Sequence, residues 1–127
     1  MYQNSMSELL SISGTDVAKC MKCGRCTASC PNAAAMDIPP HRIVSYVTEG
    51  RLQELLDCST LWQCLSCFAC VQRCPRGVKP GGLIEAARLL TIRQQGEDYL
   101  DPNDVPELLD PNTPQQLLVS AFRKYRR

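Results

Sequence analysis

Apolar residues along this chain recur mainly at the three- and four-residue intervals of an amphipathic helix. No stretch sustains the alternation of apolar and polar residues that a half-buried strand shows. A first helix is expected from the two prolines at positions 39–40, which suit a first helical turn, to Gly50. Its apolar face comprises Ile43, Val44 and Val47. The sequence therefore predicts a mainly α-helical protein.

Two further helices are predicted on the same grounds. One runs over about Arg51–Asp57, with its leucines on one face, and Ser59 or Thr60 can cap the segment that follows. The other runs over Leu83–Gln95, directly after a Pro-Gly-Gly sequence, with Gly96 as its stop. Its apolar stripe comprises Leu83, Ile84, Ala87 and Leu90.

The last part of the chain has a different composition. Residues 97–114 contain six acidic residues and four prolines but no Lys or Arg, so we expect an extended arm there. A helical pattern returns over Gln115–Tyr125, with Leu118, Phe122 and Tyr125 on one face. We therefore divide the chain into a helical domain at 1–96 and a C-terminal extension at 97–127. Docking of this extension on a partner is preferred to packing on its own domain or on a membrane surface.

Composition narrows the class of protein. The chain has 127 residues, enough for about one domain, with 14 Lys and Arg against 13 Asp and Glu. This balance argues against a basic nucleic-acid-binding surface, and the apolar stretches are too short for a membrane span. The N-terminus lacks the features of a secretory signal, so a cytoplasmic protein is expected. Nine cysteines, an odd number, then point to metal ligands rather than to disulfides.

Eight of the nine cysteines form two copies of the run Cys-x2-Cys-x2-Cys-x3-Cys-Pro, offset by 44 residues. The first run comprises Cys20, Cys23, Cys26, Cys30 and Pro31, and the second comprises Cys64, Cys67, Cys70, Cys74 and Pro75. Three cysteines at such short intervals let one tight loop place three sulfurs around a compact inorganic cube. The proline redirects the chain after the fourth cysteine, and Gly24 allows close approach of the backbone. Structural zinc is disfavoured because its cysteines usually come as separate pairs.

Each run resembles that of bacterial two-cluster ferredoxins, in which the fourth cysteine ligates the other cluster. This resemblance implies two [4Fe–4S] clusters with crossed ligands. One would be held by Cys20, Cys23, Cys26 and Cys74, and the other by Cys64, Cys67, Cys70 and Cys30.

Within the α-helical ferredoxins, residues 14–95 resemble the small iron–sulfur C subunit of heterodisulfide reductase. The resemblance rests on the segment 22–31 and on the second run, with Trp62 before it and Arg76 after it. It implies an α-helical ferredoxin fold and a protein that relays single electrons. The implied partners are a catalytic B subunit, which carries a Cys-Cys motif, and a flavin-containing iron–sulfur A subunit. Related proteins serve other reductases, so the terminal substrate stays open.

No catalytic residue is assigned. The chain has no Gly-rich dinucleotide or phosphate loop and no Cys-Cys pair. Its single histidine, His41, has no evident catalytic partner, and a surface or core role is expected. We therefore expect a non-catalytic electron-transfer subunit. The alternatives are a freely diffusing two-cluster ferredoxin, a purely structural iron–sulfur module and, least favoured, a disulfide reductase in its own right.

Two features fall outside this scheme. Cys58 is expected to be a small buried hydrophobe, with a redox-sensitive or partner-facing thiol as the alternative. Basic residues gather at both runs and could stabilise reduced clusters or simply be solvated; they could also steer an acidic partner. They are Lys19, Lys22 and Arg25 at the first run and Arg73, Arg76 and Lys79 at the second.

Overall fold

The computed structural model of the chain describes residues 6–93, 103 and 105–125, and these are mainly α-helical, with no strand among them. The predicted fold class is thereby confirmed. The chain divides into two compact units, residues 3–92 and 93–127, each described by itself. The predicted boundary between residues 96 and 97 lies outside the described residues and stays a prediction.

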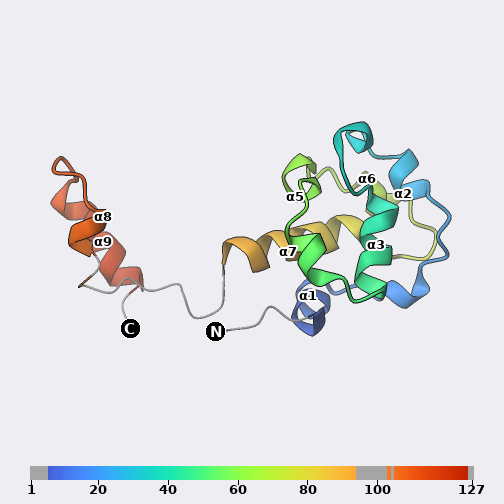
Figure 1. Ribbon diagram of the computed structural model, residues 1–127, viewed down its shortest axis with the longest axis horizontal. Coiled ribbons are helices and arrows are strands. Elements are labelled where there is room, and N and C mark those ends of the chain that lie inside the picture. The colour runs from blue at the N-terminus through green and yellow to red at the C-terminus, as the bar shows by residue number, and fades with distance from the viewer. Residues whose placement is uncertain (1–5, 94–102, 104, 126–127) are drawn as a thin grey trace. The chain divides into compact units, whose positions relative to one another are not determined.

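The first unit is built of short helices around one longer helix (Figure 1). Two of its turns are 3₁₀-helices, η1 (Val17–Lys19) and η2 (Ala33–Ala35). Its α-helices are α1 (Met6–Ser13), α2 (Arg25–Ala28), α3 (Pro40–Thr48), α4 (Leu52–Leu56), α5 (Thr60–Gln63), α6 (Ala69–Gln72) and α7 (Pro80–Ile92).

Helix α7 is the central element, because it packs against α1, α3, α4, α5 and α6. Residues from most of these helices form one continuous aliphatic core around it. The fully buried large side chains include Leu9, Ile43, Leu55, Leu61, Leu83 and Ile84. Through its contact with α6, helix α7 joins this core to the second cysteine run.

Three helices lie close to where the pattern of apolar residues predicts them. Helix α3 begins at Pro40, whose missing N–H costs nothing in a first turn, and buries its predicted face. Helix α4 occupies the interior of the predicted Arg51–Asp57 segment. Helix α7 begins at Pro80 instead of Leu83, so that Gly81 and Gly82 are part of its first turn rather than a break before it.

The cap of α5 differs from the prediction. Neither Ser59 nor Thr60 caps the helix with its own side chain. Asp37 does so from a distance in sequence: its carboxylate accepts the backbone N–H groups of Ser59 and Thr60, both at 2.9 Å, and the Thr60 hydroxyl at 2.5 Å. Burial acts to raise the pKa of Asp37, but these hydrogen bonds outweigh it and hold the pKa below its usual range.

The second unit contains α8 (Val105–Leu108) and α9 (Gln115–Tyr125). Helix α9 has the bounds that the sequence predicts. The predicted extended arm is wrong at 105–108, where a short helix forms, and residues 97–102 and 104 of that arm lie outside the described residues. On α9, Phe122 and Leu118 are half-buried, whereas Leu117 and Val119 are exposed. The side chain of Tyr125 is outside the described part.

None of the helices in the described residues is both long and apolar enough to cross a bilayer.

Candidate functional site

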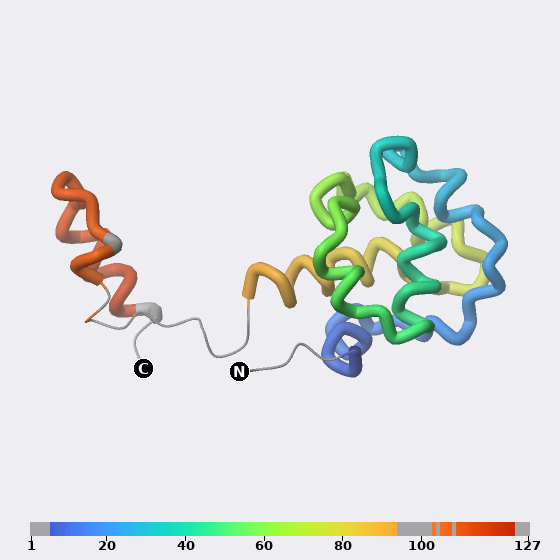
Figure 2. Tube along the Cα trace, in the orientation of Figure 1, coloured from blue at the N-terminus to red at the C-terminus, as the bar shows by residue number. Residues whose placement is uncertain are grey.

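The two cysteine runs lie side by side in the first unit, where α2 of the first run packs against α6 of the second (Figure 2). Each of these helices carries the third cysteine of its run and ends just before the fourth. A turn follows directly after each fourth cysteine, at residues 31–32 and 75–76, where a proline is the first residue. Because α2 and α6 are neighbours, the fourth cysteine of each run reaches the side of the other run.

The eight cysteines gather in two groups of four, each lining one hollow. The first hollow is lined by Cys20, Cys23, Cys26 and Cys74, and the second hollow by Cys64, Cys67, Cys70 and Cys30. The space not filled by protein atoms, including that open to solvent, is about 370 Å³ in the first hollow and about 380 Å³ in the second. Two hollows with the same number and arrangement of thiols suit two copies of one cofactor.

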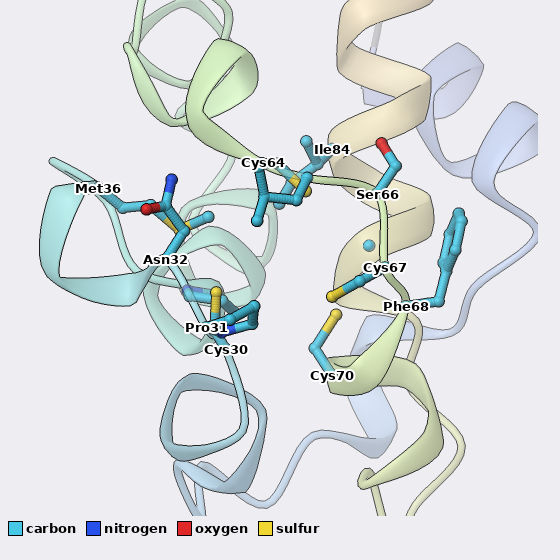
Figure 3. Close-up of a pocket in the computed structure, with 13 residues that line it drawn as sticks. Cys30, Pro31, Asn32, Met36, Cys64, Ser66, Cys67, Phe68, Cys70 and Ile84 are labelled. Carbon is cyan, nitrogen blue, oxygen red and sulfur yellow. The ribbon is translucent and has the colours of Figure 1, made fainter.

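The side chains at the second hollow point inward from opposite sides (Figure 3). Cys67 and Cys70 direct their sulfurs into it from the second run, and Cys30 faces them from the first run. The structure thus brings together the thiols that the ferredoxin resemblance groups as one ligand set. Their assignment as ligands remains a prediction.

The loops that carry the first two cysteines of each run share an unusual backbone conformation. Lys22 and its counterpart Ser66 have φ values of 56° and 54°, and Gly24 and its counterpart Phe68 have values of 76° and 56°. Left-handed backbone costs about 1–2 kcal/mol for a residue with a Cβ, and a bulky residue such as Phe68 rarely adopts it. Such strain is typical of binding sites, and its repetition indicates that both loops are shaped for the same ligand.

The first turn of α7 lies between the hollows, because Pro80 lines the first and Gly81 lines the second. The backbone of Gly81 lies close to the Cys70 thiol and acts to lower its pKa, against the larger effect of burial, which raises it. A Cβ on Gly81 would lie 3.0 Å from Cδ1 of Phe68 and 3.3 Å from the Cys70 sulfur. The absence of a side chain at Gly81 therefore allows the helix to approach the thiol, and its N-terminal N–H groups favour negative charge there.

The donor set fits an iron–sulfur cofactor. Burial raises the pKa of the Cys26 and Cys70 thiols, so both are protonated at neutral pH unless a metal binds them as thiolates. A backbone donor also reaches a sulfur in the first hollow, where the N–H of Lys22 lies 3.4 Å from Sγ of Cys20. Within the described part of the chain, no three His, Cys, Asp or Glu side chains lie close enough to hold a single metal ion.

Arg88 of α7 is hydrogen-bonded to the loop of the second run and stabilises it. Sequence analysis did not predict this role. Its guanidinium donates to the carbonyl oxygens of Leu61 and Cys64, both at 2.5 Å, and to the Ser66 hydroxyl at 2.8 Å. The carboxylate of Glu85 lies 2.7 Å from the same guanidinium. It also accepts a hydrogen bond from the Ser66 hydroxyl. The network ties the Ser66 side chain to α7. No local motif marks this role, since Arg88 lies 24 residues after Cys64.

His41 connects α3 to the first run. Its backbone N–H donates to the Thr27 hydroxyl at 3.1 Å, and its Nδ1 lies 2.8 Å from the same oxygen. Since Thr27 follows Cys26 directly, His41 braces the end of the first loop and lines the first hollow. The expectation of a surface or core role for His41 is compatible with this position.

Cys58 lies away from both hollows, with 5% of its surface exposed. Burial raises the pKa of its thiol. The prediction of a buried, hydrophobe-like Cys58 is confirmed. All nine cysteines are among the described residues, and none of them forms a disulfide.

Comparison with known proteins matches residues 19–78 to the 4Fe–4S dicluster domain family. This segment contains both cysteine runs and ends just before α7. The match supports the predicted cofactor, two [4Fe–4S] clusters.

Several relatives are the C subunits of heterodisulfide reductases from methanogens. The C subunit of the ferredoxin:CoB-CoM heterodisulfide reductase of Methanosarcina mazei is 36% identical over 87 residues, which cover 68% of this chain and 53% of the relative. The iron–sulfur C subunit of CoB–CoM heterodisulfide reductase from Methanopyrus kandleri is 36% identical over 78 residues, or 61% of this chain and 41% of the relative. The C subunit of the H2:CoB-CoM heterodisulfide,ferredoxin reductase of Methanothermobacter marburgensis is 35% identical over 83 residues, covering 65% of this chain and 45% of the relative.

The resemblance to this C subunit that the sequence motifs indicate is thereby confirmed. The chain spans about half the length of these relatives.

Proposed function

We propose that this protein is the electron-transfer subunit of a heterodisulfide reductase-like complex. The proposal starts from the 4Fe–4S dicluster domain at residues 19–78 and from the similarity to the C subunit of heterodisulfide reductase. It would relay single electrons between a flavin-containing iron–sulfur protein, the A subunit of such complexes, and a catalytic protein with a Cys-Cys motif, the B subunit. The complex would work in the cytoplasm.

The observation that carries this proposal is the grouping of thiols in two hollows. Each hollow is lined by three cysteines of one run and the fourth cysteine of the other. When bound, a [4Fe–4S] cluster in each hollow supplies a one-electron redox centre. Because the runs exchange their fourth cysteines and pack through α2 and α6, the two centres would be neighbours joined by protein backbone.

The chain's own residues would hold the centres and set their surroundings. Arg88 and His41 contact the loops of the two runs, the N–H of Lys22 donates to the sulfur of Cys20, and the backbone of Gly81 approaches the sulfur of Cys70. Hydrogen bonds to sulfur are one means by which a protein sets the potential of a cluster. In this proposal no residue of the chain is a catalyst, and the partner proteins perform the substrate chemistry.

Anaerobic purification of the tagged chain from its native host tests this function. We expect brown protein with two clusters that are reduced and reoxidised reversibly. A flavoprotein and a Cys-Cys-containing protein should accompany it at fixed ratio. Recovery of the redox-active chain alone would favour a freely diffusing ferredoxin, and clusters that cannot be reduced would favour a purely structural module.

A further inference from the structure

The two hollows are built alike but differ in charge. The cations Lys22, Arg25 and Arg76 line the first hollow, and no charged residue lines the second. With the 44-residue offset of the runs, the corresponding positions around the second hollow hold Ser66, Ala69 and Asn32. All three cations of the first hollow are thus replaced by neutral residues at matching positions of the second.

This asymmetry follows from the crossing of the chain. Arg76 comes after the second run in sequence, yet it lies at the first hollow together with Cys74 and Pro75. Asn32 makes the reverse crossing and lies at the second hollow. The basic residues that the sequence distributes over both runs therefore converge in part on one hollow.

The three cations face solvent, and none of them forms an ion pair with a described residue. Lys22, Arg25 and Arg76 are all exposed, and the ion pairs of the described residues involve only Arg51 and Arg88 as cations. No Asp or Glu occurs at 17–36 or at 66–84. Lys19 and Lys79, also exposed, flank this region, and the N–H of Lys79 donates to Thr15 Oγ1 at 3.0 Å.

The surroundings of the second hollow provide an internal comparison. Its rim is apolar, with Leu65 exposed by 65% and Phe68 by 42%. If cations were needed merely to balance the charge of a bound cluster, the second hollow would need them as much as the first. The cations instead distinguish the first hollow from the second.

We propose that the cationic rim of the first hollow, formed by Lys22, Arg25 and Arg76, is the docking surface for an acidic redox protein. Electrons would be exchanged with this partner at the first hollow rather than at the apolar second one. The inference rests on the proposed electron-transfer function and adds the charge of one partner to it. Complementary charge steers encounter and orients the partner, so it acts mainly on the association rate.

The test uses the reduced holoprotein and two one-electron oxidants of opposite charge, the anion [Co(EDTA)]⁻ and the cation [Co(NH3)6]³⁺. One electron passes from the protein to Co(III), which becomes Co(II). Rates are measured by stopped flow at low and high salt. We expect the anion rate to fall about tenfold as salt rises, and poly-L-glutamate to inhibit this reaction at low salt.

Two charge-matched variants locate the effect. K22Q/R76Q removes two charges of the rim, whereas R42Q/R93Q removes two exposed charges that do not line the first hollow. We expect K22Q/R76Q to lose most of the salt dependence and the inhibition by poly-L-glutamate, and R42Q/R93Q to keep both. Equal effects of the two variants would overturn the proposal, because net charge alone would then explain the rates.

A further readout separates docking from the tuning of potentials. Midpoint potentials and iron content are measured on the same samples. A shifted potential in K22Q/R76Q with an unchanged anion rate would mean that the cations are counter-charges, and the docking surface would be rejected. If K22Q/R76Q fails to retain iron, the single variants K22Q and R76Q are compared with R42Q and R93Q in the same way, and equal salt dependence in all four would overturn the proposal. Clusters that cannot be reduced reversibly would contradict the electron-transfer function itself.

Discussion

The sulfur of Cys70 lies against the backbone of Gly81, so close that a Cβ at this glycine would stand 3.3 Å from it. The ring of Phe68 closes the same space, at 3.0 Å from that position. Helix α7 and the loop of the second run therefore meet without room for one more carbon atom. This contact fixes the distance between the helix N-terminus and the second hollow.

Replacement of Gly81 by alanine should disturb the second hollow. Since the backbone and the Phe68 ring must shift to accept the methyl group, we expect G81A to bind less iron than the unmodified protein and to change the EPR signal of one cluster. G82A is the matched control, because its Cβ would meet only ordinary contacts at 3.4 Å and 3.5 Å. Equal iron content in G81A and G82A would contradict the close approach.

Arg88→Lys should loosen the loop of the second run. Lysine keeps the charge but cannot reach Leu61, Cys64 and Ser66 at once as the guanidinium fork does. We expect a stability loss of about 2 kcal/mol, typical of hydrogen bonds to a charged group, and faster iron release to a chelator from one cluster only. R42K is the control at an exposed site. If R88K released iron at the same rate as R42K, Arg88 would not hold the loop of the second run.

Asp37→Ala should remove the cap of α5 at a cost of about 1 kcal/mol. The melting temperature of the holoprotein would then fall by about 5 °C. Asp57→Ala is the control, since Asp57 is exposed and its carboxylate accepts hydrogen bonds from the Gln53 side chain, one helical turn away, and caps no helix N-terminus.

The effect of Asp37 should have a defined pH dependence. Because the folded-state pKa of Asp37 lies below its usual range, its contribution is complete above the unfolded pKa of about 4 and is lost as pH falls toward the folded-state value. The difference in free energy of unfolding between D37A and the unmodified protein should therefore be constant from about pH 6 to about pH 9. A difference that changes over this range would show that another group is involved.

Sequence analysis anticipates the elements with strong local patterns and misses those that depend on distant contacts. Helix α3 carries a regular apolar face and a proline at its start, and both are local. The cap of α5 comes from Asp37, 22 residues before Ser59, and no local rule relates the two. Gly81 looks like a helix breaker in sequence, but close packing against Cys70 selects glycine within the helix.

The candidate site shows the same division. The spacing of the cysteines and their resemblance to two-cluster ferredoxins suffice to group the eight thiols in two sets. The surroundings of each set depend on which segments cross, so the basic residues cannot be allotted to one hollow from their order in the chain. Arg76 follows the second run in sequence yet lines the first hollow. Arg88 was missed because its partners are carbonyl oxygens, which leave no mark on the sequence.

The central claim is that two clusters are held by crossed cysteines. EPR spectra of the reduced holoprotein with single Cys→Ser substitutions test it most directly, with C58S as the control that should keep both signals unchanged. C67S and C23S identify the signals of the two clusters. If the ligands cross, C30S should alter the same signal as C67S, and C74S the same signal as C23S. If C30S instead alters the signal that C23S alters, each run holds its own cluster and the crossed arrangement is wrong.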